Sequence, residues 1–186
     1  MDKILLTEQQ ITDICIKMGK QITEDLKNEE KIPVFVGVMK GALNFMYDLL
    51  KRIDMPLYTD FIQISSYVGT QTSGVVLLSK DVTMDLTGRT VVIIEDVIDT
   101  GISMDYLVKH MMKKGTKRVL VCTLFNKTIA RKLPVQIDYY GALLEEDAFL
   151  LGYGLDYREI HRNEPYVFTP AKGEIAELDK YIEERK

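Results

Sequence analysis

A short segment in the middle of this 186-residue chain, residues 95–103, combines three carboxylates with two hydroxyls. The acids are Glu95, Asp96 and Asp99, and the hydroxyls are those of Thr100 and Ser103. If a helix begins at this point, its first backbone N–H groups have no helical partner and its dipole adds positive charge, which suits a phosphate. Two carboxylates ~4 Å apart repel by about 4 kcal/mol at an effective dielectric constant of about 20, so the acids need hydroxyls, a divalent cation or a proton. A sugar phosphate with vicinal hydroxyls satisfies both requirements.

The flanking residues predict the elements that position this segment. Residues 91–94 are four consecutive β-branched apolar residues, typical of a strand buried on both faces of a parallel sheet. After Gly101, apolar residues recur at helical spacing, and Gly115 stands where a C-cap glycine is expected. Open α/β sheets bind ligands where such a strand ends and a helix begins. A plain helix N-terminus, with Asp99 stabilised by the dipole, remains the alternative interpretation.

A second strand-to-helix turn follows the apolar run at 33–38. It reads Met39-Lys40-Gly41-Ala42 and precedes a predicted helix with an apolar face. The helix dipole disfavours a cation at a helix start, so binding an anionic ligand explains Lys40 better than simple solvation does.

The next predicted strands are 57–65 and 75–79, an antiparallel pair. The polar, glycine-containing segment 65–74 between them is either a long hairpin connection or a lid that closes over a site. A further strand covers 118–125, and Lys127 follows at the carboxyl end of the sheet. Position alone does not distinguish a site lysine from an exposed loop lysine.

The remaining elements are predicted from composition and periodicity. Phe149 is either a core residue or a stacking surface, on which a purine would gain about 1–3 kcal/mol. The charged stretch 156–162 has a solvated helix as its simple interpretation. The other predictions are a capping box at 7–10 that starts a helix, strands at 136–143 and 165–168, and a surface helix at 174–186.

The composition describes an ordinary globular chain, 46% hydrophobic and 28% charged, large enough for one domain with a full core. The net charge of −4 argues against broad nucleic-acid affinity. The helix dipole accounts for a basic cluster at 113–118, with a nucleic-acid patch as the alternative.

Cys15 and Cys122 lie in apolar segments and are expected to pack as small hydrophobes in a reducing compartment. No apolar run approaches about 20 residues and no signal-peptide layout is present, so a cytoplasmic protein without a membrane partner is expected.

Residues 93–103 resemble the phosphoribosyl-diphosphate (PRPP) binding motif of type I phosphoribosyltransferases. Further matches make residues 33–162 similar in order and spacing to the hypoxanthine-guanine phosphoribosyltransferases. These matches are Met39-Lys40-Gly41, Ser65-Ser66-Tyr67, Lys127 and residues 147–157. The resemblance implies an α/β fold of the type I phosphoribosyltransferase class. That fold is a central parallel sheet flanked by helices, with a small hood formed by terminal segments and a long flexible hairpin loop. It also implies one domain over 1–186, with its core at about 30–145 and the hood at about 1–10 and 146–186.

The reaction implied by the resemblance is purine salvage. PRPP and hypoxanthine or guanine give IMP or GMP and pyrophosphate, with Mg²⁺ as cofactor. Xanthine is left open as a third base. The family also implies a homodimer or homotetramer, and no nucleic-acid partner.

The resemblance assigns roles residue by residue. Asp99 is the general base or hydrogen-bond partner at purine N7. PRPP is bound by Glu95, Asp96, Asp99, Thr100, Gly101, Ile102 and Ser103, and pyrophosphate by Lys40, Gly41 and Arg162. The purine is bound by Lys127, Phe149, Leu150 and Asp156, the mobile loop carries Ser66 and Tyr67, and the metal is held by Glu95, Asp96 and Asp156. In one departure from the pattern, some relatives carry a lysine where Ile102 stands.

Two rival functions remain open. A regulator with this fold would bind PRPP or a nucleotide without turnover, which explains the phosphate turn but not the combination of Lys127 with Phe149. A phosphate-accepting enzyme would use Asp96 or Asp99 as nucleophile and would form a covalent phosphoaspartate.

Overall fold

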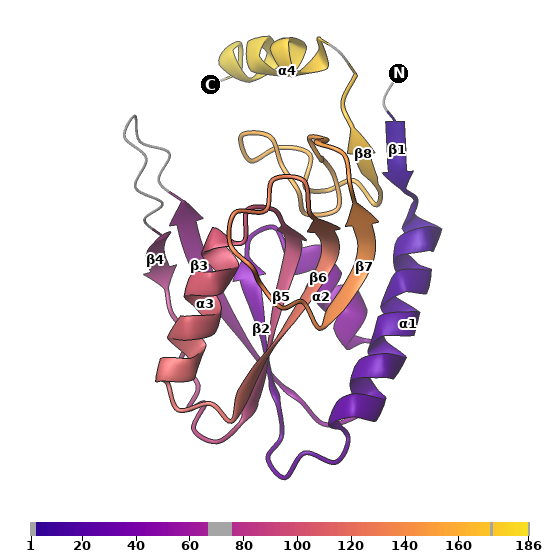
Figure 1. The fold of residues 1–186 in the computed structure, drawn as a ribbon. Helices are drawn as coiled ribbons and strands as arrows, with labels where there is room; N and C mark the ends of the chain where they lie inside the picture. Colours follow the sequence, from indigo (N-terminus) through magenta and orange to yellow (C-terminus); the bar gives the residue numbers. More distant parts are fainter. Residues whose placement is uncertain (1–2, 67–75, 172, 186) are drawn as a thin grey trace.

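The structure, a computed structural model, describes residues 3–66, 76–171 and 173–185. A six-stranded sheet with the order β4-β3-β2-β5-β6-β7 forms its centre (Figure 1). The strands are β2 (Val34–Met39), β3 (Tyr58–Ser66), β4 (Val76–Lys80), β5 (Thr90–Ile98), β6 (Arg118–Lys127) and β7 (Tyr139–Leu144). Only β4 runs antiparallel to its neighbour within this sheet. The predicted α/β class is therefore confirmed, as is the antiparallel pair at its edge.

Helices cover both faces of the sheet, α1 (Glu8–Leu26) and α2 (Leu43–Leu50) on one and α3 (Ile102–Lys113) on the other. Side chains along β5 alternate between the two layers. Val92 and Ile94 pack with α1 and α2, whereas Val91 and Ile93 pack with α3. This alternation is why the strand needs apolar residues at every position, as the sequence predicted.

Two local predictions on the α1 side of the sheet are confirmed. Thr7 caps α1, and Gln10 completes the capping box. Cys15 and Cys122 are free and fully buried. Burial raises the pKa of Cys15 to about 11 and that of Cys122 well above its ordinary value, so both remain neutral thiols that pack as hydrophobes.

The described part of the predicted hood lies above the carboxyl ends of the parallel strands (Figure 1). Here β1 (Lys3–Leu6) pairs antiparallel with β8 (Val167–Thr169). The last helix, α4 (Glu174–Glu183), is attached through Asp179, which accepts hydrogen bonds from the Tyr157 hydroxyl at 2.9 Å and from Arg158 at 2.7 Å. None of the described helices combines the length and the apolar character needed to span a membrane.

The structure differs from the sequence predictions in two places. The strand predicted at 136–143 begins only at Tyr139, because the side chain of Asp138 accepts the hydrogen bond of the Val121 amide at 2.8 Å. The solvated helix considered for 156–162 is wrong. Arg158, Glu159 and His161 have φ values of 51°, 75° and 69°, which no right-handed helix can contain.

Candidate functional site

A cavity of about 430 Å³ opens at the carboxyl ends of β2 and β5. The chain leaves β2 toward α2 on one face of the sheet and leaves β5 toward α3 on the other, so the cavity lies at a topological switch point. Most of the residues predicted for PRPP and pyrophosphate meet there. They are Lys40, Gly41, Glu95, Asp96, Asp99, Thr100, Gly101, Ser103 and Arg162, and Asp156, predicted for the purine and the metal, joins them.

The turn from β5 into α3 presents backbone amides to this cavity. Gly101 is the N-cap of α3, with φ 83° and ψ −8°, and it has no side chain to cap the first amides. A Cβ at Gly101 would lie 2.6 Å from the carbonyl oxygen of Leu133, so both the conformation and the close approach require glycine. Uncapped amides at a helix start form an anion site.

Glu95 and Asp96 form an acidic pair at the floor of the cavity. Burial raises the pKa of Glu95 well above its ordinary value, and the neighbouring charge of Asp96 raises it further. Burial likewise raises the pKa of Asp96. Oxygen donors confined in this way suit a hard divalent cation such as Mg²⁺, which would neutralise their charge. Within the described ranges no three His, Cys, Asp or Glu side chains are grouped so that they could hold a metal ion.

Cations on the other side of the cavity are paired with acids from the hood. Lys40 Nζ lies 2.7 Å from Glu159 Oε2. Arg162 contacts Asp156 Oδ1 at 2.7 Å and Glu159 Oε1 at 3.3 Å. These hydrogen bonds, with Lys40 first and Arg162 second, hold the pKa of Glu159 below its usual range. Glu159 thus occupies with its own carboxylate the two cations that the sequence assigns to pyrophosphate.

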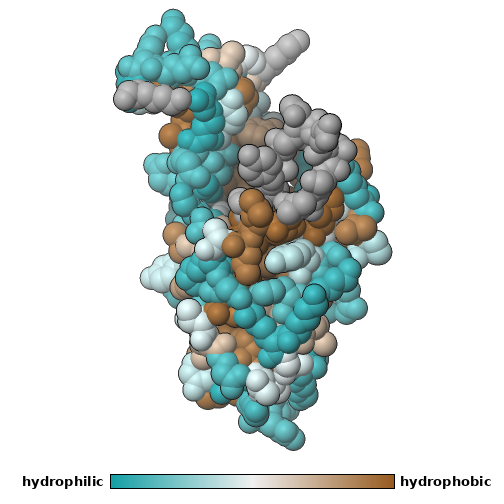
Figure 2. Space-filling model, turned by 90° about the vertical axis from the view of Figure 1, so that its left-hand side faces the viewer, coloured by the Kyte–Doolittle hydropathy of each residue, from teal (hydrophilic) through white to brown (hydrophobic). Residues whose placement is uncertain are grey.

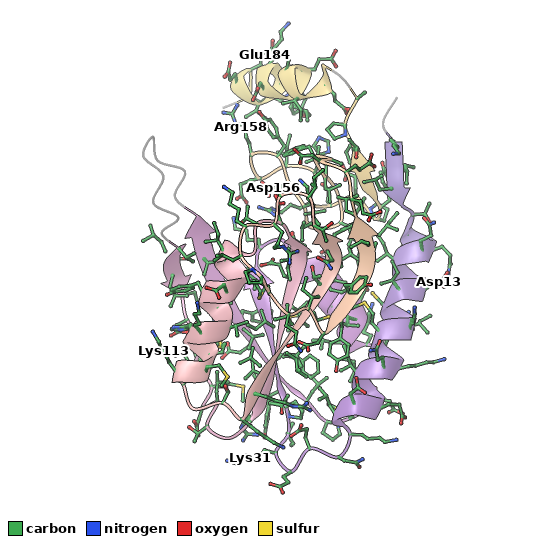
Figure 3. All side chains as sticks on the ribbon, in the orientation of Figure 1. Asp13, Lys31, Lys113, Asp156, Arg158 and Glu184 are labelled. Carbon is green, nitrogen blue, oxygen red and sulfur yellow. The ribbon has the colours of Figure 1, made fainter. Side chains whose placement is uncertain are left out.

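Close backbone packing brings the hood to this turn. A Cβ at Gly154, which has φ 102°, would overlap the carbonyl oxygen of Gly41. A Cβ at Gly41 would in turn overlap the carboxylate of Asp96. The two glycines therefore allow the hood, the β2–α2 turn and the acidic pair to stack in direct contact. Asp156 lies in the hood above the ends of the strands, while Arg158 lies farther up, beside α4 (Figure 3).

Of the residues predicted for the purine, Asp156 lines the cavity, Lys127 is connected to it through Asp99, and Phe149 and Leu150 lie outside its lining. The side chain of Lys127 is only 9% exposed; its Nζ lies 2.6 Å from Asp147 Oδ1 and 3.7 Å from Asp99 Oδ2. The other oxygen, Asp99 Oδ1, is buried and has no hydrogen-bond partner among the described residues. Phe149 is 49% exposed and meets Tyr157 edge to face, with 6.0 Å between ring centroids, and Leu150 is buried beside it.

Among the residues predicted for PRPP, Ile102 does not line the cavity. Ile102 lines a separate groove with Val76, Tyr106 and Leu133. That groove is on the α3 and β4 side of the molecule, the face shown in Figure 2. Tyr67 lies outside the described residues, and so does the side chain of Ser66.

Sequence reasoning gave no role to three residues that the structure places at the site: Arg131, Asp147 and Glu159. Arg131 donates hydrogen bonds to the main chain around Asp99 and Lys127. The sequence held one weak signal for Arg131, because this arginine follows the candidate site residue Lys127 by four positions. Asp147 stands in an acidic stretch and Glu159 in a stretch of mixed charge, where nothing in the sequence marks either acid as a site residue.

Comparisons with known proteins give a consistent result. The phosphoribosyl transferase domain model matches residues 2–158. The hypoxanthine-guanine phosphoribosyltransferase of Staphylococcus epidermidis is 39% identical over 170 residues, covering 91% of this chain and 93% of that protein. The protein of the same name from Bacillus subtilis is 39% identical over 168 residues, with 90% and 92% covered. The crystal structure of a hypoxanthine phosphoribosyltransferase from Staphylococcus aureus superposes with a TM-score of 0.86 at 38% identity, covering 93% of this chain and 92% of the other.

Proposed function

The chain belongs to the hypoxanthine-guanine phosphoribosyltransferases, and we propose how its residues divide the work of that reaction. It is an enzyme of purine salvage, a pentosyl glycosyltransferase. It transfers the 5-phosphoribosyl group from PRPP to N9 of hypoxanthine or guanine and produces IMP or GMP and pyrophosphate. The observation that carries the residue assignment is the position of Asp99. One oxygen of this carboxylate lies 3.7 Å from Lys127 and the other is unpartnered among the described residues, while the next residues form the anion turn.

The PRPP half of the site is assigned to the cavity. Its 5′-phosphate binds the amides and hydroxyls of 99–103, where Ile102 contributes its main chain because its side chain does not line the cavity. Glu95 and Asp96 accept hydrogen bonds from the ribose 2′- and 3′-hydroxyls. Lys40, Gly41 and Arg162 bind the pyrophosphate, whose negative charge grows as the bond to C1 breaks.

Mg²⁺ fits the oxygen donors of the acidic pair and is proposed as the cofactor. Glu95, Asp96 and Asp156 would hold it, directly or through its water shell, together with substrate oxygens. When bound, it supplies positive charge that neutralises the diphosphate. Asp156 is also the partner of Arg162, so it orients the cation nearest to the leaving group.

The base half of the site selects 6-oxopurines. Lys127 donates a hydrogen bond to O6, and a 6-amino purine is rejected because its amino group would face a buried ammonium. Asp99 Oδ1 accepts the N7 proton or hydrogen bond. Phe149 stacks on the ring, and the Leu150 carbonyl faces the N1 and C2 edge. The role of Ser66 and Tyr67, closing over the reacting carbon to exclude water, is proposed from the resemblance alone, because their side chains lie outside what the structure describes.

The remaining family features are proposed on the same basis. Residues 1–186 form one domain with a core at about 30–145 and a hood at about 1–10 and 146–186. The enzyme works in the cytoplasm as a homodimer or homotetramer. It binds no nucleic acid and no membrane. Its substrates are PRPP, hypoxanthine and guanine, with xanthine as a third base to be tested.

A spectrophotometric assay with PRPP, Mg²⁺ and each purine in turn tests the function directly. Hypoxanthine and guanine should give IMP and GMP, adenine should give no product, and chelation of Mg²⁺ should abolish turnover. Binding of PRPP without nucleotide formation from any base would indicate a regulator instead. A phosphorylated aspartate that survives denaturation would indicate the phosphoaspartate chemistry considered above.

A further inference from the structure

We propose that Arg131 is a positioning residue that holds the phosphate turn and the purine lysine in one fixed arrangement. The inference rests on the proposed function, because it concerns how the two halves of that site are kept in register. Arg131 lies in the loop between β6 and β7, outside the cavity lining, and acts on the main chain behind it.

A single guanidinium connects the ends of two strands. Its Nε donates to the carbonyl oxygen of Asp99 at 2.8 Å, and its Nη2 donates to that of Ile98 at 3.1 Å. The same Nη2 donates to the carbonyl oxygen of Lys127 at 3.0 Å and to Asn126 Oδ1 at 2.8 Å. The end of β5, which leads into the phosphate turn, and the end of β6, which carries Lys127, are thereby tied to one planar group.

The main chain of the next two loop residues binds a third carbonyl of the turn, that of Thr100. The amides of Lys132 and Leu133 both donate to the carbonyl oxygen of Thr100, at 2.9 and 3.1 Å. Gly101 packs directly against the same loop, close to the Leu133 carbonyl and the Arg131 side chain. Three consecutive carbonyls, those of residues 98, 99 and 100, therefore all point at the 131–133 segment.

The direction of these carbonyls determines what the cavity presents to a phosphate. In a planar trans peptide the N–H points opposite to the C=O of the preceding residue. Holding the carbonyls of 98, 99 and 100 at the loop therefore turns the amides of 99, 100 and 101 away from the loop, toward the cavity. If one of these peptides flipped, a carbonyl oxygen would face the phosphate and repel it. Arg131 keeps the anion turn in its donating orientation.

The same group also fixes the position of the purine lysine. The side chain of Lys127 is almost fully buried, so the position of its ammonium depends on the position of its backbone. That backbone must be fixed for the ammonium to reach O6. Its carbonyl is fixed by Arg131, and Asp99, whose carbonyl Arg131 also holds, faces the ammonium at 3.7 Å. A lysine at 131 could not replace the arginine, because a point-like ammonium does not supply the planar fork that reaches these carbonyls together.

The test compares Arg131→Met and Arg131→Lys with a control at the adjacent position, Lys132→Met. The exposed side chain of Lys132 makes none of these contacts. Steady-state kinetics are measured for PRPP and for hypoxanthine separately, and folding is followed by the melting temperature. Arg131→Met should raise the KM for both substrates by about tenfold or more, because both half-sites lose their support. Arg131→Lys should lie between wild type and Arg131→Met, and the control should stay within about twofold.

A change in melting temperature with both KM values unchanged would make Arg131 merely structural and would overturn the proposal, as would a change confined to one substrate. If Arg131→Met does not fold, Arg131→Lys decides by the same two KM values. If the wild type forms no nucleotide, the proposed function fails. Calorimetric titration of PRPP into wild type and Arg131→Lys then tests the turn alone, and equal affinities would overturn its positioning by Arg131.

Discussion

Lys127 and Asp147 form a 2.6 Å ion pair that joins the interior of the protein to its surface. The lysine side chain is only 9% exposed, whereas that of the aspartate is 78% exposed. A buried ammonium without a counter-charge would be costly, and Asp147 offsets that cost before any base is bound. The ammonium has three donors, so it can keep this contact and still donate to a ligand.

Replacing Lys127 by Ala should damage the use of purine bases much more than the use of PRPP. Loss of a hydrogen bond from a charged donor costs about 1.5–3 kcal/mol, which corresponds to a rise of roughly 10- to 100-fold in the KM for hypoxanthine and guanine. The KM for PRPP should change little. Lys109→Ala, on the exposed side of α3, is the control. Unchanged purine kinetics in Lys127→Ala would show that the base binds elsewhere.

Replacing Phe149 by Ala should weaken base binding without destabilising the fold. The ring is half exposed, so its truncation removes little buried area. Loss of stacking should cost about 1–3 kcal/mol, seen as a rise in the purine KM of at least roughly fivefold. Phe149→Tyr keeps an aromatic face and should stay close to wild type. Equal KM values for the Ala and Tyr variants would contradict the stacking role.

Replacing Glu159 by Gln should strengthen pyrophosphate binding. In the proposed assignment this carboxylate competes with pyrophosphate for Lys40 and Arg162. Both cations hold the pKa of Glu159 below its ordinary value, so the carboxylate remains charged at neutral pH. Exposed ion pairs are weak, so product inhibition by pyrophosphate should become only roughly two- to fivefold tighter. Glu177→Gln on α4 serves as the matched control. Weaker inhibition in Glu159→Gln would mean that this acid assists, rather than competes with, the leaving group.

Replacing Asp60 by Asn should destabilise the protein at neutral pH. Asp60 Oδ1 accepts the Phe61 amide at 2.7 Å, and Oδ2 accepts the Thr83 and Met84 amides at 2.7 and 3.0 Å. An asparagine NH₂ would face donors on one of these two sides, at a cost of about 2–3 kcal/mol in the free energy of unfolding. Urea unfolding measures this loss. Asp13→Asn, on the outer surface of α1 (Figure 3), should change it by no more than about 0.5 kcal/mol.

The same site predicts a pH dependence. Burial by itself raises the pKa of Asp60, but the hydrogen bonds from Phe61, Met84 and Thr83 outweigh it and hold the pKa below its ordinary value of 3.8. The folded state therefore binds a proton less readily than the unfolded state. The stability advantage of wild type over Asp60→Asn should be complete at neutral pH. It should shrink as the pH falls below 3.8, and a constant difference down to acid unfolding would refute this account.

Sequence reasoning succeeded where local patterns alone determine structure. The apolar run of β5, the turn at Gly101 and the C-cap at Gly115 have signals that depend only on neighbouring residues, and all three were found. It failed where long-range contacts decide. Residues 156–162 are helix-like in composition, but Asp156, Glu159 and Arg162 bond to one another and to Lys40 and impose left-handed backbone instead. The role of Arg131 was not predicted for the same reason. Main-chain oxygens accept its hydrogen bonds to residues 98, 99 and 127, and no sequence pattern marks such acceptors.

The pairing of β1 with β8 has a consequence for the order in which the enzyme becomes complete during translation. β1 precedes the six-stranded sheet in the chain, yet its strand neighbour among the described residues is made from residues 167–169, which follow that sheet. The main-chain bonds between Leu151 and Phe168 extend the same small sheet toward Phe149 and Leu150. A nascent chain can therefore assemble the six-stranded sheet and the turn at 99–103 first, and it completes the small sheet beside Phe149 and Leu150 only after residues 167–169 have been synthesised.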